Sequence, residues 1–151
     1  MQVLLVRHTS VAVPKGTCYG QTDVPLADSF IDEARQTLSN IGSFFPCDAV
    51  YSSPLSRAMR LAAYCGFHSP ITDNRLMEMN MGEWEMRRYE DVSDPYLQQW
   101  YDDYLHLPTP HGESFPMLYA RVASFLDDLK KNDFSRVAVF SHGGVIVAAT
   151  V

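Results

Sequence analysis

Two arginines and two histidines in this sequence each lie just past a short apolar run that reads as a β-strand. Arg7 and His8 follow residues 3–6, Arg57 comes shortly after 49–51, and His142 follows 137–140. In open α/β sheets, ligands bind outside the carboxyl ends of parallel strands, so we expect these four side chains to share one crevice. Guanidinium groups match phosphate oxygens bidentately. The sequence therefore predicts a pocket for a phosphate group.

Several other phosphate chemistries are excluded by the motifs that the chain lacks. It contains no Gly-x-x-x-x-Gly-Lys-Ser/Thr loop, and none of its three cysteines has an arginine six positions later. No predicted strand ends in an Asp-x-Asp pair. Histidine is then the available nucleophile, because a neutral imidazole can attack phosphorus while nearby cations stabilise the equatorial oxygens.

A phosphomonoester also needs a proton on its leaving oxygen. Glu78, Glu83 and Glu85 are the candidates for this general acid, and Glu78 lies between two methionines. From spacing alone, an exposed loop carboxylate is the favoured interpretation of Glu78. Gly143 follows His142 and permits a close approach of the backbone to an anion.

Composition limits the class of protein. The chain has 151 residues, is 46% hydrophobic and carries a formal net charge of -6, which indicates one domain and argues against nucleic acid or an anionic membrane as a partner. Three cysteines without metal-ligand spacing favour a reducing compartment. The first apolar run is interrupted by Arg7, short of a signal peptide or membrane span. We expect a cytoplasmic protein, and a homo-oligomer stays open.

The predicted element order is strand, helix, strand, helix, an irregular middle, helix, strand, helix, which is typical of an α/β fold with a mainly parallel sheet. Apolar spacing predicts helices at residues 28–45, 53–65 and 114–131, with Ser53-Pro54 and Ser114 at the starts of the last two. Residues 86–110 form an aromatic and acidic insertion that could cover the site. Its aromatic side chains are Tyr89, Tyr96, Trp100, Tyr101 and Tyr104.

These motifs together resemble the histidine phosphatase superfamily, also called phosphoglycerate mutase-like. The resemblance is carried, in order, by Arg7-His8-Thr9, by Ser52 to Ala58, by Glu78 to Glu85, and by Ser141 to Gly144. It implies a three-layer α/β/α fold, with His8 as nucleophile, Glu78 as proton donor, and Arg7, Arg57 and His142 as the phosphate cradle. It also implies that no metal or cofactor is needed.

Within that family, Cys18 to Leu26 and the Arg-His-Thr triplet are similar to α-ribazole phosphatases of the cobalamin pathway. That resemblance implies a phosphomonoesterase acting on α-ribazole 5'-phosphate. Further substrate contacts are expected from Thr9, Tyr19, Gln21, Thr22, Glu113, Ser114 and Gly143. Gln21 or Thr22 would replace an asparagine that the family usually has after its first motif.

Three alternatives stay open at this point. The first is a broad-specificity phosphatase of small phosphorylated metabolites, the second is a phosphoglycerate mutase, and the third is a non-catalytic phospho-ligand binding module. The sequence stops at Val151, soon after an apolar helix start with no C-cap glycine. We therefore expect the family's C-terminal helix and strand to be shortened.

Overall fold

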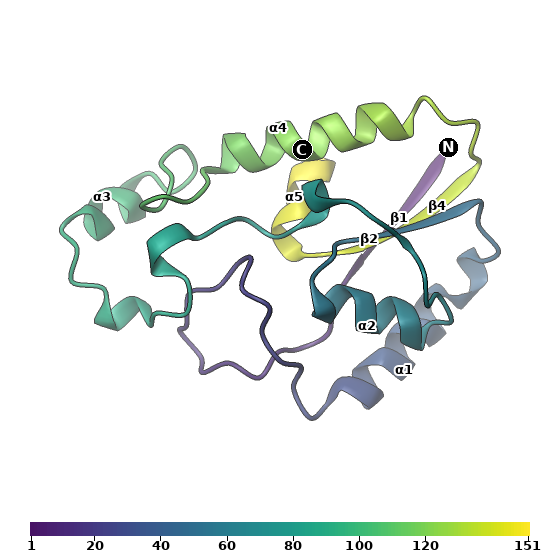
Figure 1. Ribbon diagram of the computed structural model, residues 1–151, viewed down its shortest axis with the longest axis horizontal. Coiled ribbons are helices and arrows are strands. Elements are labelled where there is room, and N and C mark those ends of the chain that lie inside the picture. The colour runs from purple at the N-terminus through teal and green to yellow at the C-terminus, as the bar shows by residue number, and fades with distance from the viewer.

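The computed structural model describes residues 1–151 and has a central sheet of four parallel strands. The strands are β1 (Gln2–Arg7), β2 (Ala49–Ser52), β3 (Ile71–Thr72) and β4 (Arg136–Ser141), in the spatial order β1-β4-β2-β3. Arg7 lies opposite Ser141, and Ser52 lies opposite Phe140. The carboxyl ends of the three longer strands therefore meet at one edge of the sheet (Figure 1).

Helices cover both faces of this sheet (Figure 1). They are α1 (Phe30–Ile41) and α2 (Ser56–Tyr64) on one face, and α4 (Phe115–Leu129) and α5 (Gly143–Thr150) on the other. Side chains alternate along β4, so Val137 and Val139 pack with α4 and α5 while Ala138 and Phe140 pack with α1 and α2. This arrangement confirms the predicted three-layer α/β/α fold.

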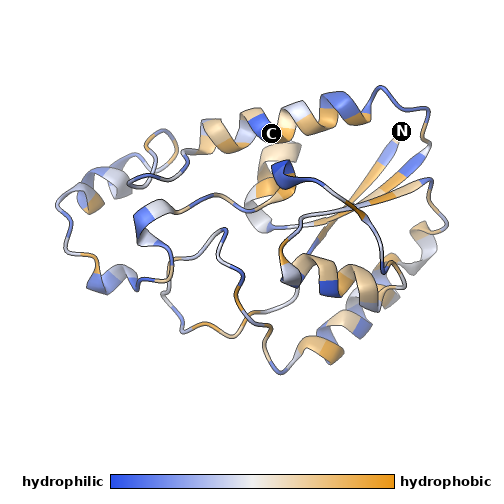
Figure 2. Cartoon of the chain, viewed as in Figure 1, coloured by the Kyte–Doolittle hydropathy of each residue, from blue (hydrophilic) through white to orange (hydrophobic).

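The apolar spacing of the helices explains where they pack. Figure 2 shows apolar and polar patches alternating along α1, α2 and α4, as expected for helices with one buried face. Helix α4 begins as predicted, because the hydroxyl of Ser114 accepts a hydrogen bond from the backbone N–H of Met117. Helix α1 ends earlier than predicted, at Ile41, and the chain continues in the 3₁₀ turn η1 (Gly42–Phe44).

The predicted start of α2 at Ser53-Pro54 is wrong. The helix begins at Ser56, after an extended Leu55. A carboxylate from a distant loop caps it instead, since Asp23 accepts hydrogen bonds from both the backbone N–H and the hydroxyl of Ser56, at 3.0 and 2.6 Å. This long-range cap fixes the loop of residues 20–23 against the first turn of α2.

Residues 86–110, which we call the aromatic segment, are more regular than the sequence suggested. They contain the 3₁₀ turn η4 (Tyr89–Asp91) and the helix α3 (Tyr96–Asp102), and they follow the 3₁₀ turns η2 (Asn74–Leu76) and η3 (Gly82–Trp84). The aromatic segment packs on a small apolar cluster around Trp84 and Cys18, apart from the two clusters that flank the sheet. No helix of the protein is both long and apolar enough to cross a bilayer.

Candidate active site

The predicted cationic residues converge at the carboxyl edge of the sheet. Arg7 ends β1, His142 lies between β4 and α5, and Arg57 lies in the first turn of α2. The rings of His8 and His142 are 5.1 Å apart between centroids. The topology therefore assembles four side chains that are up to 135 positions apart in the sequence (Arg7 to His142).

His8 is held as a neutral imidazole with one nitrogen free. Its Nδ1 lies 2.7 Å from the carbonyl oxygen of Thr9, and because a carbonyl can only accept, Nδ1 carries the proton. Burial, together with the charges of Arg57 and Arg7, lowers the pKa of His8 to about 4. At neutral pH, Nε2 therefore presents an unprotonated lone pair, as a nucleophile needs.

Arg57 is a fully buried cation with no carboxylate beside it in an ion pair. Its guanidinium donates to the carbonyl oxygen of Thr22 at 2.9 Å and to that of Gly20, and its Nε has no partner. The ring of Tyr19 lies against it, with 5.3 Å between the ring centroid and Cζ. An uncompensated buried charge is costly, so this position favours the binding of an anion.

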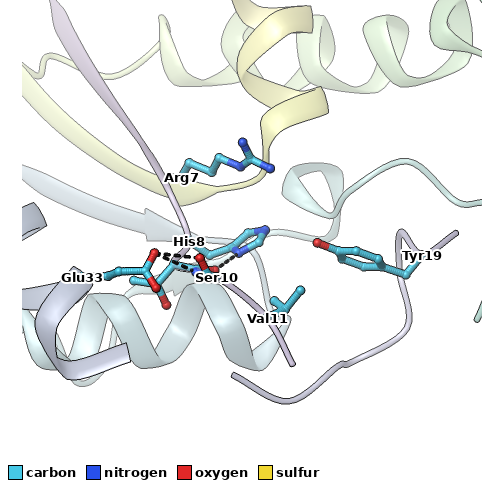
Figure 3. A pocket seen from close by; sticks show the side chains of 7 residues that line it. Arg7, His8, Ser10, Val11, Tyr19 and Glu33 are labelled. Carbon is cyan, nitrogen blue, oxygen red and sulfur yellow. Dashed lines mark hydrogen bonds between the residues drawn. The ribbon is translucent and has the colours of Figure 1, made fainter. Parts of the chain in front are cut away.

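The guanidinium of Arg7 makes no hydrogen bond or ion pair within the protein, so it is a second cation without a carboxylate partner. Figure 3 shows its guanidinium, the ring of His8 and the hydroxyl of Tyr19 facing one common space. Thr9, which is also buried, has a hydroxyl oxygen with no partner. These unused donors face the same small region and match the several oxygens of a phosphate group.

Glu78 lines a second cavity, which it shares with Arg7, His8 and Tyr19. Its two carboxylate oxygens accept hydrogen bonds from the backbone N–H groups of Met79 and Gly144, at 2.9 and 3.1 Å. A Cβ at position 144 would lie 2.3 Å from Oε1 of Glu78, so a larger residue there would displace this carboxylate. Of the three glutamates weighed from the sequence, only Glu78 lines a cavity together with His8.

The other two glutamates have structural partners. Glu83 is exposed and pairs with His111 at 2.7 Å. Glu85 accepts hydrogen bonds from the backbone N–H groups of Gly20 and Gln21 and from the hydroxyl of Thr22. Glu85 therefore holds the loop that in turn contacts Arg57.

Four of the predicted substrate contacts lie behind the site rather than in it. Glu113 forms an ion pair with Arg121 at 2.8 Å, and Ser114 caps α4. Gln21 donates to the carbonyl oxygen of Glu78 at 3.1 Å, while Thr22 contacts Glu85 and Arg57. None of these four residues lines a cavity, and neither do Arg57 and His142. Arg57 and His142 each keep a buried nitrogen without a partner, whereas the side chains of these four residues are engaged within the protein, so the geometry gives the four positioning rather than contact.

Arg121 was not singled out from the sequence, yet it organises the segment that carries Glu78. Its guanidinium donates to the carbonyl oxygens of Arg75, Met77 and Glu78, at 2.7 to 2.9 Å, while Glu113 neutralises it. Because one guanidinium binds three carbonyl oxygens, it holds the backbone of residues 75–78 in place and thereby positions the carboxylate of Glu78. Only its place in an amphipathic helix was visible in the sequence.

Two cavities open beside His8, and both are lined by Arg7, His8 and Tyr19. The first, of about 350 Å³, is polar and is completed by Thr9, Ser10, Val11 and Glu33. The second, of about 370 Å³, is mainly apolar and is completed by Glu78, Met79, Met81, Tyr89, Trp100, Tyr104 and Gly144. A substrate bound at His8 therefore has a polar side and an aromatic side within reach.

The polar cavity holds one carboxylate that was not selected from the sequence. Glu33, from α1, accepts hydrogen bonds from the backbone and the hydroxyl of Ser10 (Figure 3). It also accepts one from the hydroxyl of Ser29. In the sequence it reads as one more charged residue on the polar face of an amphipathic helix. Its place near His8 depends on how α1 docks.

The chain resembles known proteins along nearly its whole length. Residues 3–151 match the family described as histidine phosphatase superfamily, branch 1. The adenosylcobalamin/alpha-ribazole phosphatase of Salmonella typhimurium is 29% identical over 154 residues, which cover 97% of this chain and 76% of that protein. Phosphoserine phosphatase 1 of Hydrogenobacter thermophilus is 29% identical over 150 residues, which cover 94% and 71%.

One solved structure is similar to this chain in fold. The crystal structure of the alpha-ribazole phosphatase from Shigella flexneri superimposes with a TM-score of 0.87 at 27% identity, covering 97% of this chain and 76% of that one. The protein belongs to the histidine phosphatase superfamily, and its family and relatives support a phosphatase.

Proposed function

We propose that this protein is a metal-independent phosphomonoesterase that works through a phosphohistidine on His8. The observation that carries the proposal is the neutral His8 with Nε2 free, set between Arg7, Arg57 and His142, with Glu78 lining the same cavity as His8. In the first step Nε2 attacks phosphorus and the ester P–O bond breaks. Glu78 gives its proton to the departing oxygen, and the alcohol leaves.

The second step returns the enzyme to its starting state. Glu78, now a carboxylate, takes a proton from a water molecule as that water attacks the phosphohistidine. The P–N bond breaks, inorganic phosphate leaves and His8 is neutral again. Arg7 and Arg57 stabilise the charge on the equatorial oxygens in both steps, as positioned cations do in phosphoryl transfer.

The apolar cavity supports a flat aromatic group on the substrate. Tyr89, Trp100 and Tyr104 line it, and the rings of Tyr89 and Trp100 are stacked at 6.2 Å and 16°. Stacking on a base is worth roughly 1 to 3 kcal/mol in nucleic-acid complexes. We therefore propose α-ribazole 5'-phosphate, whose base is a benzimidazole, as the substrate, with the aromatic segment covering the site.

The other two tyrosines of the aromatic segment, Tyr96 and Tyr101, do not line the apolar cavity. Tyr96 donates its hydroxyl hydrogen to the carbonyl oxygen of Pro108 at 2.8 Å, and Tyr101 is 46% exposed and lines no cavity. The acidic residues of the segment disfavour polyanionic substrates by like-charge repulsion. They are Glu90, Asp91, Asp94, Asp102 and Asp103.

A second candidate substrate is favoured by the polar cavity. The carboxylate of Glu33 lies beside His8 there, so a small phosphate ester with an ammonium group could place the cation near Glu33 and the phosphate near Arg7. One relative is named a phosphoserine phosphatase. O-phosphoserine therefore joins α-ribazole 5'-phosphate as a substrate to be compared.

The test measures kcat/KM for α-ribazole 5'-phosphate, O-phosphoserine and 3-phosphoglycerate in the presence of EDTA. We expect the ribotide to be preferred, and Trp100→Ala to raise its KM by about tenfold, as the loss of one stacked ring predicts. Tyr119→Ala, which removes an exposed ring of α4 that lines neither of the two cavities beside His8, is the control. A preference for O-phosphoserine that Glu33→Gln abolishes would support the second candidate, and isomerisation of 3-phosphoglycerate would indicate a mutase.

A further inference from the structure

The second histidine of the site has one side-chain partner, and that partner is a serine. The hydroxyl oxygen of Ser53 lies 2.8 Å from Nε2 of His142, and both residues are fully buried at 0% exposure. Ser53 follows β2 directly, and its backbone N–H donates to the carbonyl oxygen of Phe140 in β4 at 2.9 Å. The sheet itself therefore holds the serine beside the histidine.

Hydrogen-bond accounting decides which of the two groups donates. The hydroxyl oxygen of Ser53 already accepts a hydrogen bond from the backbone N–H of Leu55 at 3.2 Å, and His142 is the only other partner within reach. If Nε2 carried the proton, both the serine hydrogen and the lone pair of Nδ1 would be buried without partners. With the proton on Nδ1 only that one N–H is unpaired, so the hydroxyl donates and Nε2 accepts.

We propose that Ser53 is a positioning residue that fixes His142 as the tautomer with its proton on Nδ1. Nδ1 has no protein partner although it is buried, so its N–H is free for a ligand. The use of that N–H as a donor to a phosphoryl oxygen rests on the function proposed above, whereas the tautomer itself does not. Burial, together with the charges of Arg57 and His8, lowers the pKa of His142 to about 2, so the ring is neutral.

The two histidines then have complementary roles. The carbonyl oxygen of Thr9 leaves His8 with a free lone pair, and the hydroxyl of Ser53 leaves His142 with a free N–H. A neutral N–H can stabilise a phosphoryl oxygen without giving up its proton. Glu78 then remains the one proton donor to the leaving group.

Long-range ¹H–¹⁵N correlation spectra of the ¹⁵N-labelled protein at neutral pH test the tautomer directly. We expect His142 to show a protonated Nδ1 and an unprotonated Nε2, with its signals assigned by their loss in His142→Gln. In Ser53→Ala the population protonated at Nδ1 should fall while His8 stays unchanged. A wild-type ring protonated at Nε2, or at both nitrogens, would overturn the proposal, and so would an unchanged tautomer in Ser53→Ala.

Ser52→Ala is the matched control. Ser52 is equally buried, and its hydroxyl donates to the carbonyl oxygen of Ser53 rather than to the histidine. We expect Ser52→Ala to keep the tautomer, and Ser53→Thr, which keeps the hydroxyl, to restore it if Ser53→Ala folds poorly. A Ser53→Thr protein that folds but loses the Nδ1 proton would contradict the proposal.

Activity gives a second readout. We expect Ser53→Ala to lower kcat for p-nitrophenyl phosphate by about 10- to 100-fold, as the loss of one preorganised donor predicts, and Ser52→Ala to lower it much less. A wild-type protein with the expected tautomer but no turnover would leave the positioning role standing and reject the proposed function. Full turnover in Ser53→Ala would reject the positioning role alone.

Discussion

The carboxylate of Glu78 accepts a hydrogen bond from the backbone N–H of Gly144, at 3.1 Å, and this contact joins the proposed proton donor to the first turn of α5. His142 lies just before the same helix. The two residues therefore keep one geometry relative to each other, although 64 positions separate them (78 to 142). The backbone that follows β4 positions both.

Gly144→Ala should separate the carboxylate from this helix. The new Cβ would lie 2.3 Å from Oε1 of Glu78, so the glutamate must move, whereas alanine itself favours the helix by up to about 1 kcal/mol. We expect a thermal midpoint close to that of the wild type and a kcat lower by about 10- to 100-fold. Gly42→Ala, where a Cβ meets nothing within 4 Å, is the control. Unchanged turnover in Gly144→Ala would remove the argument for this contact.

Glu78→Gln should slow poor leaving groups more than good ones. If Glu78 protonates the leaving oxygen, alkyl phosphates should lose about 10²- to 10⁴-fold in kcat, and p-nitrophenyl phosphate much less, because its phenolate leaves with less help. Glu83→Gln, an exposed glutamate paired with His111, should affect neither. Equal slowing of both substrates would assign Glu78 to binding instead.

Much of this fold follows from local patterns in the sequence. Apolar runs at residues 3–6, 49–51 and 137–140 are strands, and Ser114 caps its helix as predicted. The polar groups past those strands come together because parallel strands share one carboxyl edge. The short strand β3 and the helix α3 were missed, because both are too short to show a clear hydrophobic period.

The rest of the site depends on contacts between distant segments. Asp23 caps α2, and Arg121 donates hydrogen bonds to the carbonyl oxygens of Arg75, Met77 and Glu78. No local sequence pattern identifies such partners, because a charged residue on a helix or loop is expected to face solvent unless the tertiary structure is known. Glu113 and Ser114 show the reverse case. The family resemblance predicted substrate contacts for both, but Glu113 pairs with Arg121 and Ser114 caps α4.

Acid should destabilise the protein through its buried histidines. The folded-state pKa of His142, about 2, lies below its unfolded value near 6.5, so the unfolded state binds the proton first and stability falls as pH drops below 6.5. We expect His142 to account for about 2 kcal/mol of lost unfolding free energy between pH 7 and pH 5. Urea unfolding of His142→Gln at both pH values should show a smaller loss. An equal loss in the two proteins would refute this assignment.

Glu113→Gln tests the support behind Glu78. The side chains of Glu113 and Arg121 are only 16% and 18% exposed, so removing one charge leaves the other poorly compensated, at a cost of roughly 2 to 4 kcal/mol. Thermal unfolding should show this loss, with a parallel fall in kcat. Asp32→Asn breaks the exposed pair with Arg35, and it should change stability by less than about 1 kcal/mol. If both variants lost equally little, the support role of Glu113 would be rejected.

The central claim is that His8 becomes phosphorylated during turnover, and rapid quenching of the enzyme during turnover of ³²P-labelled substrate tests it most directly. The account predicts label on the protein that is labile to acid and stable to base, that maps to His8 by mass spectrometry, and that forms in the presence of EDTA. His8→Ala should trap none and should lose at least about 10³-fold in turnover while remaining folded. Label on any other residue, or wild-type turnover with no labelled protein at any quench time, would contradict the account.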